Sequence, residues 1–370
     1  MNIVLSGGGT AGHINPALAL AEELQSRGHA VFFAGTPSGV EARLVPQAGV
    51  SFTAFEASGF NRRHPLSLIR ALRLMAASTK KAKEWFGEIK PAAAVCFGGY
   101  VSIPVGRAAM AQNIPLIIHE QNSVMGMANK YLSKKAARVA LTYDAAGSAV
   151  ADKSKLVLTG NPVRKSMFET SRADGRAYCG VPEDATMLLI FGGSLGARHI
   201  NTAVCAAKDA ILGLDGVYVR HITGPKEFDT VSEALNLNDE EAKRWQLISY
   251  EDHMAECLVA CDAVVSRAGA TSLAEISALQ IPALLVPYPY ATADHQTANA
   301  KSYVECGAAY MVADSEVEGQ DFLDKLLRLA SSAELRASMK QAAAAFETQS
   351  ASGRLADLVE EAAGISANIK

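Results

Sequence analysis

One stretch of the sequence concentrates residue types that bind phosphate and hydroxyl groups. Residues 266–299 read SRAGATSLAEISALQIPALLVPYPYATADHQTAN. The first turn should lead into a helix that begins near Thr271 or Ser272, either of which could cap it, and the positive end of such a helix attracts phosphate. Glu275 lies three residues beyond Ser272, so it is either the second half of a capping box or a carboxylate that accepts hydrogen bonds from ribose hydroxyls.

A second polar run, Asp294 to Asn299, follows the next buried strand and opens another helix after a proline-containing loop. Its carboxylate, imidazole, amide and hydroxyl groups can bind the hydroxyl groups of a sugar. The whole stretch therefore predicts a site for a ligand that carries both phosphate and hydroxyl groups.

A glycine turn near the N-terminus has the same phosphate-binding character. The short strand 3–5 leads into SGGGTAGH, after which Asn15-Pro16 should open an amphipathic helix. The backbone of such a turn can hold a phosphate, and we expect His13 to project at its rim.

The same turn formally satisfies a dinucleotide-binding fingerprint, with Gly7, Gly9 and Gly12 at the required spacing. That function also needs an acidic residue at the end of the second strand, where it holds a ribose. The second strand, 30–34, runs instead into GTPS, and the first carboxylate after it is Glu41. We therefore do not favour a nicotinamide or flavin enzyme.

Composition limits the classes of protein that these motifs could serve. The chain has 370 residues, 49% hydrophobic content and a mean hydropathy of +0.10, enough for large cores in two domains. No apolar run approaches the ~18 residues that span a bilayer, so we expect a soluble protein that stays in the cytoplasm. The six cysteines are scattered and should be reduced packing residues.

Charge divides unevenly along the chain. Residues 1–162 carry 17 Lys and Arg against 9 Asp and Glu, whereas residues 163–370 carry 18 against 29. The basic first half suggests an anionic surface or ligand, and the acidic second half argues against a nucleic acid across the whole protein. The segment 62–90 is both basic and apolar at helical spacing, which fits either a solvated helix packed on a sheet or an interfacial patch on anionic lipid.

Strand and helix patterns alternate along the chain. The expected strands are 3–5, 30–34, 93–97 and 116–118 in the first half and 187–191, 218–222, 246–249, 263–265 and 283–286 in the second. Such alternation is typical of a parallel sheet covered by helices, and polar turns after its strands lie where such sheets bind ligands. We predict an α/β protein with two Rossmann-like, doubly wound domains at 1–162 and 163–345, and a helical tail at 346–370 that packs back on the first.

Seven motifs carry a resemblance to a known family. They are GGGTAGHINPALALAEEL, CFGGYVSIP, HEQNSVMGMANK, TGNPVR, FGGSLGAR, SRAGATSLAEISAL and DHQTANA, in this order and spacing. Together they resemble the bacterial peptidoglycan N-acetylglucosaminyltransferases of glycosyltransferase family 28, which convert lipid I to lipid II, over nearly the whole chain.

This resemblance implies a GT-B fold, in which two Rossmann-like domains face a deep cleft. It implies UDP-N-acetylglucosamine as the donor and undecaprenyl-pyrophosphoryl-N-acetylmuramyl-pentapeptide (lipid I) as the acceptor. The transfer would be inverting and metal-independent, without a cofactor. The protein would lie peripherally on the cytoplasmic face of the cell membrane, against an anionic membrane surface.

The resemblance also assigns residues to the two substrates. The donor contacts would be Thr10, Ala11, Gly12, Asn122, Arg164, Ser194, Glu251, Ala270, Thr271, Ser272, Leu273, Ala274, Glu275 and Gln296, and the acceptor pyrophosphate would lie against Gly8, Gly9, Gly98, Gly99 and Tyr100. The uracil is expected against the backbone near Glu251, where many relatives have an apolar residue. Side-chain chemistry agrees with charge from Arg164 and with hydroxyl binding by Glu275 and Gln296.

An inverting transfer needs a base that deprotonates the acceptor hydroxyl. His13 is the first choice, because an unperturbed imidazole titrates near neutral pH and this one should face the cleft. It could instead only orient the acceptor or cap the loop. Glu120 and His119 are competing candidates, and His119 could equally be a buried hydrogen-bonding histidine.

Two other classes of function share part of this pattern. One is another GT-B enzyme, such as a glycosyltransferase with a soluble acceptor or a UDP-sugar 2-epimerase, which would not need the basic apolar segment. The other is a non-catalytic subunit that binds a nucleotide sugar, although both halves of the expected cleft are present in this chain.

Overall fold

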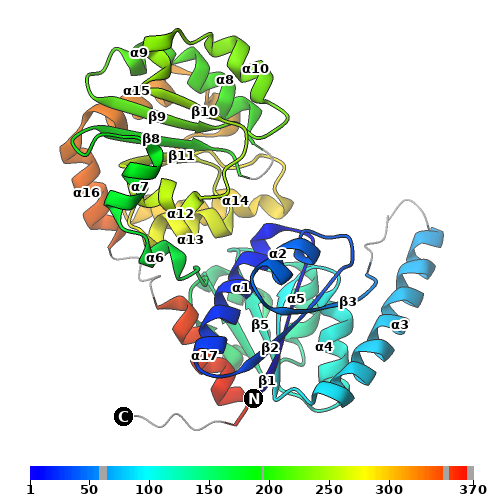
Figure 1. Cartoon of the computed structure of the whole chain (residues 1–370). Helices are drawn as coiled ribbons and strands as arrows, with labels where there is room; N and C mark the ends of the chain where they lie inside the picture. The colour runs from blue at the N-terminus through cyan, green and yellow to red at the C-terminus, as the bar shows by residue number, and fades with distance from the viewer. Residues whose placement is uncertain (58–64, 194–195, 345–349, 365–370) are drawn as a thin grey trace, which may run out of the picture. The chain divides into compact units, whose positions relative to one another are not determined.

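The structure is a computed structural model that describes residues 1–57, 65–193, 196–344 and 350–364, with the backbone alone at 65–70. The chain divides into two compact units. Unit 1 comprises Met1–Arg164 and Thr348–Lys370, and unit 2 comprises Lys165–Glu347. Each unit is described by itself below (Figure 1).

Unit 1 is built on a seven-stranded sheet in which every pairing is parallel and the strand order is β3-β2-β1-β4-β5-β6-β7. The strands are β1 (Asn2–Gly7), β2 (Ala30–Gly35), β3 (Ser51–Ala54), β4 (Ala93–Gly98), β5 (Leu116–Glu120), β6 (Arg138–Leu141) and β7 (Leu156–Leu158). The helices are α1 (Ala11–Ser26), α2 (Glu41–Gln47), α3 (Pro65–Ile89), α4 (Ser102–Ala111), α5 (Met127–Ser133) and α17 (Ala351–Ala362), with 3-10 helices η1 (Asp144–Ala149) and η2 (Lys153–Lys155).

Helices cover both faces of the unit 1 sheet. Ile3 and Leu5 of β1 pack on one face with side chains from α1, α2 and α17, whereas Val4 packs on the other with side chains from α3, α4 and α5 (Figure 1). Successive residues of a strand point to opposite faces, so a strand that is buried on both faces must be apolar throughout. This explains why the strands of this half read as continuous apolar runs.

Unit 2 repeats this plan with six parallel strands in the order β10-β9-β8-β11-β12-β13. The strands are β8 (Thr186–Phe191), β9 (Val217–Ile222), β10 (Trp245–Ile248), β11 (Ala263–Ser266), β12 (Ala283–Leu285) and β13 (Ala309–Met311). The helices are α6 (Ser166–Glu169), α7 (Arg172–Cys179), α8 (Arg198–Ala206), α9 (Lys208–Leu212), α10 (Phe228–Leu235), α11 (Asp239–Ala242), α12 (Met254–Ala260), α13 (Ala270–Ala278), α14 (His295–Glu305), α15 (Gln320–Ser331) and α16 (Ala333–Ala343), with η3 (Thr292–Asp294) and η4 (Asp314–Glu316).

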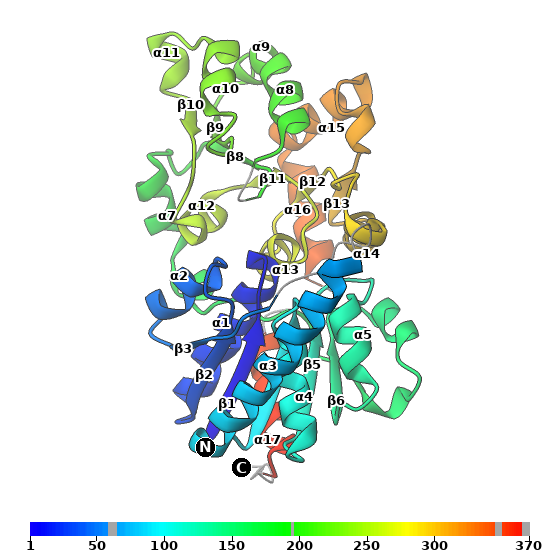
Figure 2. The ribbon, with the colours of Figure 1, turned by 90° about the vertical axis from the view of Figure 1, so that its right-hand side faces the viewer.

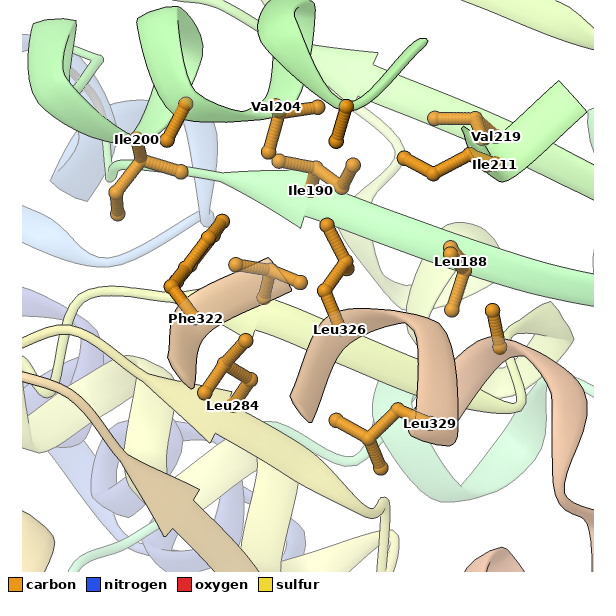
Figure 3. Close-up of a cluster of buried hydrophobic side chains, with 14 of the residues drawn as sticks. Leu188, Ile190, Ile200, Val204, Ile211, Val219, Leu284, Phe322, Leu326 and Leu329 are labelled. Carbon is orange, nitrogen blue, oxygen red and sulfur yellow. The ribbon is translucent and has the colours of Figure 1, made fainter. Parts of the chain in front are cut away.

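The centre of unit 2 is a cluster of fully buried aliphatic and aromatic side chains. Leu188 and Ile190 of β8 meet Ile200 of α8 and Phe322 and Leu326 of α15 (Figure 3). This cluster packs the central strand against α8, which follows it directly, and against α15, which follows β13.

Both sheets have a strand order that reverses direction at one point, between β1 and β4 in unit 1 and between β8 and β11 in unit 2. Open α/β sheets bind ligands outside the carboxyl ends of the two strands at such a point. The predicted fold class, α/β with two Rossmann-like doubly wound sheets, is confirmed, and each of the nine expected strands is found within a few residues of its expected bounds.

One expected helix start and one expected helix cap were wrong. Helix α1 begins at Ala11 and contains Pro16, instead of beginning at Asn15. Proline there removes only one intrahelical donor, so the first turn forms ahead of it. Helix α13 begins at Ala270 with Gly269 at the N-cap, so neither Thr271 nor Ser272 caps it, and the capping-box role of Glu275 falls away.

Helix α3 has one face in the core and one face exposed. Phe86 is buried, and Trp85 and Ile89 pack beside it on the layer formed with α4. Leu72, nearer the start of the helix, is 53% exposed. Among the described residues, no helix has both the length and the apolar character that crossing a bilayer would require.

Helix α17 belongs to the core of unit 1. Leu355 and Val359 are fully buried in the layer that contains α1. Around this apolar contact, the Arg27 guanidinium lies 2.6 Å from the Asp357 carboxylate and 2.9 Å from that of Glu360. Helix α17 therefore completes the same core that β1 begins.

We predict that Leu355→Ala lowers the free energy of unfolding of unit 1 by about 2–5 kcal/mol, because it leaves a cavity between α17 and the sheet. Urea unfolding measures the loss. The matched control is Leu72→Ala, the same truncation at an exposed position, which should change stability by about 0.5 kcal/mol or less. Equal effects of the two substitutions would contradict the assignment of α17 to the core.

Candidate functional site

Two glycine turns meet at the carboxyl ends of β1 and β4. A Cβ atom on Gly99 would lie 2.5 Å from the carbonyl oxygen of Gly8, and Gly99 has a φ of +82°. Both facts require glycine at this position, since a side chain would collide with the first turn and the backbone favours no L residue there. The two turns, which were expected to contact an acceptor pyrophosphate, therefore lie against each other, with the half-exposed ring of Tyr100 beside them.

His13 lies in the first turn of α1, beside both glycine turns. Its Nδ1 is 2.9 Å from the carbonyl oxygen of Gly8. A carbonyl only accepts, so Nδ1 carries the proton and the neutral ring has its lone pair on Nε2. That Nε2 lies against the backbone of Gly98, 3.0 Å from where a Cβ would stand. The ring is partly exposed, so Nε2 is in a position to accept a proton from a ligand.

His119 is buried inside β5 and is held on both ring nitrogens. Its Nε2 donates to the carbonyl of Gly160 at 2.9 Å, and its Nδ1 accepts from Gln121 at 3.1 Å. Burial lowers the pKa of His119 to about 4, although the bond to Gly160 acts in the opposite direction. The interpretation of His119 as a buried hydrogen-bonding histidine fits this geometry.

Glu120, at the end of β5, orders the loop that follows it. Its carboxylate accepts hydrogen bonds from the Asn122 N–H at 3.1 Å, from the Gly126 N–H at 3.0 Å and from the Asn129 amide at 2.9 Å. These bonds occupy both carboxylate oxygens and fix the backbone at Asn122, one of the expected donor contacts. The geometry therefore favours a structural role for Glu120 and leaves His13 as the better placed of these two candidates.

Arg164 ends unit 1, next to the strand-end segment 159–163. Its Nε atom is buried and has no hydrogen-bond partner within the part of the chain that the structure describes. The neighbouring carbonyl of Val163 accepts from Ser352 of α17 at 3.2 Å, which holds this segment in place. A guanidinium with an unused donor is suited to an anionic ligand.

In unit 2, the turn after β8 is also shaped by glycine. A Cβ atom on Gly196 would lie 2.0 Å from the carbonyl oxygen of Thr223, so no other residue fits there. This turn leads directly into α8, as expected for a phosphate-binding turn. Ser194, an expected donor contact, lies outside the described residues.

The turn after β11 is held by a buried ion pair. Arg267 donates to the carbonyls of Val286 and Pro287, each at 3.1 Å, and its Nη1 lies 2.5 Å from the buried carboxylate of Asp314. Asp314 also lies 2.6 Å from Nδ1 of His199 at the start of α8. This network joins the turns after three strands and holds them in one arrangement at the carboxyl edge.

Helix α13 presents its N-terminal turn at the same edge. Ala270, Leu273 and Ala274 are buried, whereas Thr271, Ser272 and Glu275 are partly exposed. From the adjacent helix, Asn299 donates to the carbonyl of Ala268 at 3.3 Å, and Gln296 accepts from the Tyr288 N–H at 2.9 Å. The expected sugar-binding helix is therefore fixed to the expected phosphate-binding turn.

The Glu251 side chain is directed into unit 2. Its carboxylate accepts from Arg220 at 2.5 Å, from the Tyr178 hydroxyl at 2.8 Å and from the His253 N–H at 2.9 Å. Burial alone would raise the pKa of Glu251, but these hydrogen bonds outweigh it and hold the pKa below its usual range. The carboxylate thus fixes the turn at 250–253, and only the backbone of Glu251 is left to contact a ligand.

The structure gathers the sequence-predicted site residues at two edges. Those from unit 1 surround the carboxyl ends of β1, β4 and β5 and the segment that ends at Arg164, and the described ones from unit 2 surround β10, β11 and the start of α14. The sequence analysis did not identify the charged residues that hold these turns in place, which are Glu41, Arg220, Arg267 and Asp314. In the ranges that the structure describes, no group of His, Cys, Asp and Glu side chains is arranged to hold a metal ion.

Comparison with known proteins matches one family in each half of the chain. Residues 3–141 match the glycosyltransferase family 28 N-terminal domain, and residues 187–355 match the glycosyltransferase family 28 C-terminal domain. A relative from Halothermothrix orenii, named "UDP-N-acetylglucosamine--N-acetylmuramyl-(pentapeptide) pyrophosphoryl-undecaprenol N-acetylglucosamine transferase", is 36% identical over 98% of this chain and 99% of its own. The chain belongs to glycosyltransferase family 28.

Two further similarities support the assignment of this chain to glycosyltransferase family 28. A relative of the same name from Bacillus subtilis is 37% identical over 98% of this chain and 99% of its own. The crystal structure of MurG from Acinetobacter baumannii superimposes with a TM-score of 0.74 at 28% identity, covering 97% of this chain and 99% of that chain. The resemblance drawn from the seven motifs is therefore confirmed.

We predict that burial of His119 makes unit 1 of this family 28 enzyme sensitive to acid. The unfolded state takes up a proton near pH 6.5, whereas folded His119 stays neutral until about pH 4. The contribution of neutral His119 to the free energy of unfolding is therefore complete above pH 6.5 and is lost as the pH falls towards 4. The loss is about 2 kcal/mol between pH 7 and pH 5.

Hydrogen exchange of the β5 amides at the two pH values measures this loss, after correction for intrinsic rates. His119→Gln keeps a donor to Gly160 without a group that titrates in this range, so it should flatten the dependence. The same pH dependence in both proteins would assign the acid sensitivity to other groups.

Proposed function

We propose that this chain transfers N-acetylglucosamine from UDP-N-acetylglucosamine to the 4-hydroxyl of the N-acetylmuramyl group of lipid I, forming lipid II in peptidoglycan synthesis. The observation that carries this proposal is the full-length similarity to enzymes named as this transferase, at 36–37% identity. The proposed transfer inverts the anomeric centre and uses neither a metal nor a cofactor.

The donor is proposed to bind mainly at the carboxyl edge of the unit 2 sheet. The glycine turn after β8 and the positive end of α13 suit the diphosphate. Glu275 is partly exposed on α13 and suits the ribose hydroxyls, and Gln296 suits the sugar hydroxyls. The uracil is proposed to lie on the backbone at Glu251, which the buried carboxylate below keeps in place.

The acceptor is proposed to bind at the carboxyl edge of the unit 1 sheet. The turns at Gly8–Gly9 and Gly98–Tyr100 would lie near its pyrophosphate, and Nε2 of His13 would remove the proton from its 4-hydroxyl. Negative charge then develops on the departing UDP. The Nε of Arg164, which has no hydrogen-bond partner among the described residues, is suited to stabilise this charge, and so is the α13 dipole.

Membrane attachment is proposed for the exposed face of α3. Arg73, Lys80 and Lys83 are exposed beside Leu72, so basic and apolar groups share one side of this helix. Figure 2 shows α3, α4 and α5 on the same side of the unit 1 sheet. Exposed Met127 and Tyr131 on α5 would extend the surface, and the lipid of the acceptor would remain in the bilayer.

We predict that the purified chain transfers labelled N-acetylglucosamine from its UDP donor to a short-chain lipid I analogue in the presence of EDTA. A muramyl peptide without the pyrophosphoryl lipid is the control acceptor and should give no product. Release of UDP without transfer, or equal transfer to the control, would overturn the acceptor assignment and favour an enzyme with a soluble acceptor.

We predict that Arg73→Glu combined with Lys80→Glu weakens binding to vesicles containing anionic phospholipid by at least about 10-fold, since each basic residue near such a surface contributes ~1 kcal/mol. Lys81 is left unchanged, because it donates to the carbonyl of Ala54 at 2.8 Å. Vesicle sedimentation at low and high salt measures the effect.

The matched control reverses the charge of two exposed lysines of unit 2, Lys226→Glu and Lys340→Glu, which changes the net charge equally. Binding that is lost equally in both double variants would show that total charge, and not this face of α3, governs attachment.

A further inference from the structure

Glu41 is a fully buried carboxylate directly beneath the first glycine turn. It is the first residue of α2, and none of its surface is exposed. Its Oε1 accepts from the Thr36 N–H at 3.0 Å and from the Thr36 hydroxyl at 2.6 Å, and its Oε2 accepts from the Gly9 N–H at 3.4 Å. The last of these bonds is long, so packing must contribute to the contact with the turn.

Three glycines open the space that this carboxylate occupies. A Cβ atom on Gly8, Gly35 or Gly39 would lie 2.6, 2.5 or 2.3 Å from atoms of the Glu41 side chain. Three positions around this single carboxyl group are therefore occupied by glycine, where a side chain would collide with it. Such a close fit means that the position of Glu41 and the position of the Gly8 peptide depend on each other.

The charge of Glu41 is compensated by neutral donors only. No Lys, Arg or His side chain of the described ranges forms an ion pair with it. Burial of a carboxylate without a cation is costly, and an apolar side chain would fill the same space at lower cost. Packing alone thus does not explain an acid at this position.

The Gly8 peptide connects Glu41 to His13. One side of Gly8 rests on the Glu41 carboxylate, and its carbonyl oxygen accepts from Nδ1 of His13 at 2.9 Å. The same carbonyl is packed against Gly99 from the second turn. Hence the group that sets the tautomer of the proposed base is itself set in place by Glu41.

We propose that Glu41 is a positioning residue for His13 in the transfer reaction, an inference that rests on the proposed function. By fixing the Gly8 carbonyl, it keeps the imidazole proton on Nδ1 and the lone pair on Nε2.

In that step, Nε2 takes the proton of the acceptor 4-hydroxyl, and the oxygen forms its bond to the anomeric carbon. The bond from the anomeric carbon to UDP breaks, and its electron pair leaves with the diphosphate. The imidazolium then returns its proton to solvent. Glu41 touches no reacting atom and keeps its charge throughout.

The buried charge of Glu41 should affect kcat and the KM for the acceptor differently. Glu41 lies beneath the turn proposed to be near the acceptor pyrophosphate, so its charge repels that group weakly. Removing the charge should therefore lower kcat without raising the KM for the acceptor. A residue that only held the turn in a binding conformation would raise this KM when replaced.

The test is Glu41→Gln in the full chain, compared with Glu56→Gln, the same change at an exposed position of unit 1. We expect Glu41→Gln to lower kcat by about 10-fold or more, with unchanged or lower acceptor KM and with UDP affinity within 3-fold of wild type. The loss should stay smaller than the ~10²-fold loss expected for His13→Ala.

A second readout does not depend on transfer. The ¹⁵N signals of the His13 ring should report the Nδ1–H tautomer in the wild type and in Glu56→Gln, and a mixture of tautomers in Glu41→Gln. Thr36→Val removes one donor from Glu41 and should give the same changes to a smaller extent, which keeps the test open if Glu41→Gln does not fold.

Unchanged ring signals in Glu41→Gln, or a raised acceptor KM with unchanged kcat, would overturn the positioning role. A wild-type chain that does not transfer the sugar would overturn the proposed function instead, and the ring signals alone would then decide whether Glu41 controls the His13 tautomer.

Discussion

Parallel pairing of the strands is the constraint on which both units depend. In a parallel sheet each strand must be followed by a crossover, so all strands end at one edge and every turn that follows them gathers there. The chain can therefore place Gly8, Gly99 and Glu120, which are distant in sequence, around neighbouring strand ends of one unit. Burial of the apolar strands stabilises each unit, so the residues of the turns are available to bind ligands.

The strands and the places of the polar turns could be predicted from sequence, because buried parallel strands are short apolar runs that end in glycine or polar residues. The helix start at Ala11 and the N-cap at Gly269 could not, because the proline and hydroxyl residues that usually mark a start lie inside these helices. Likewise, nothing local to Glu41 indicates that a turn 30 residues earlier will cover it, since its burial is a product of the β1–β2 pairing.

The two units support their sites by different means. In unit 1 the two glycine turns pack against each other, against the His13 ring and on a buried carboxylate, Glu41. In unit 2 two buried ion pairs, Arg267 with Asp314 and Arg220 with Glu251, join the turns after several strands. In each pair the two charges compensate each other within the protein, so the pairs hold backbone in place instead of offering charge to a ligand. Arg164, whose Nε has no partner among the described residues, differs in this respect.

The packing of α17 on α1 has a consequence for how the chain folds during its synthesis. Leu355 and Val359 are synthesised after all of unit 2, yet they fill the core that β1 begins. Domains generally fold as units during synthesis. Unit 2 can therefore complete its core while the core of unit 1 still lacks α17, so unit 1 begins to be synthesised before unit 2 but finishes folding after it.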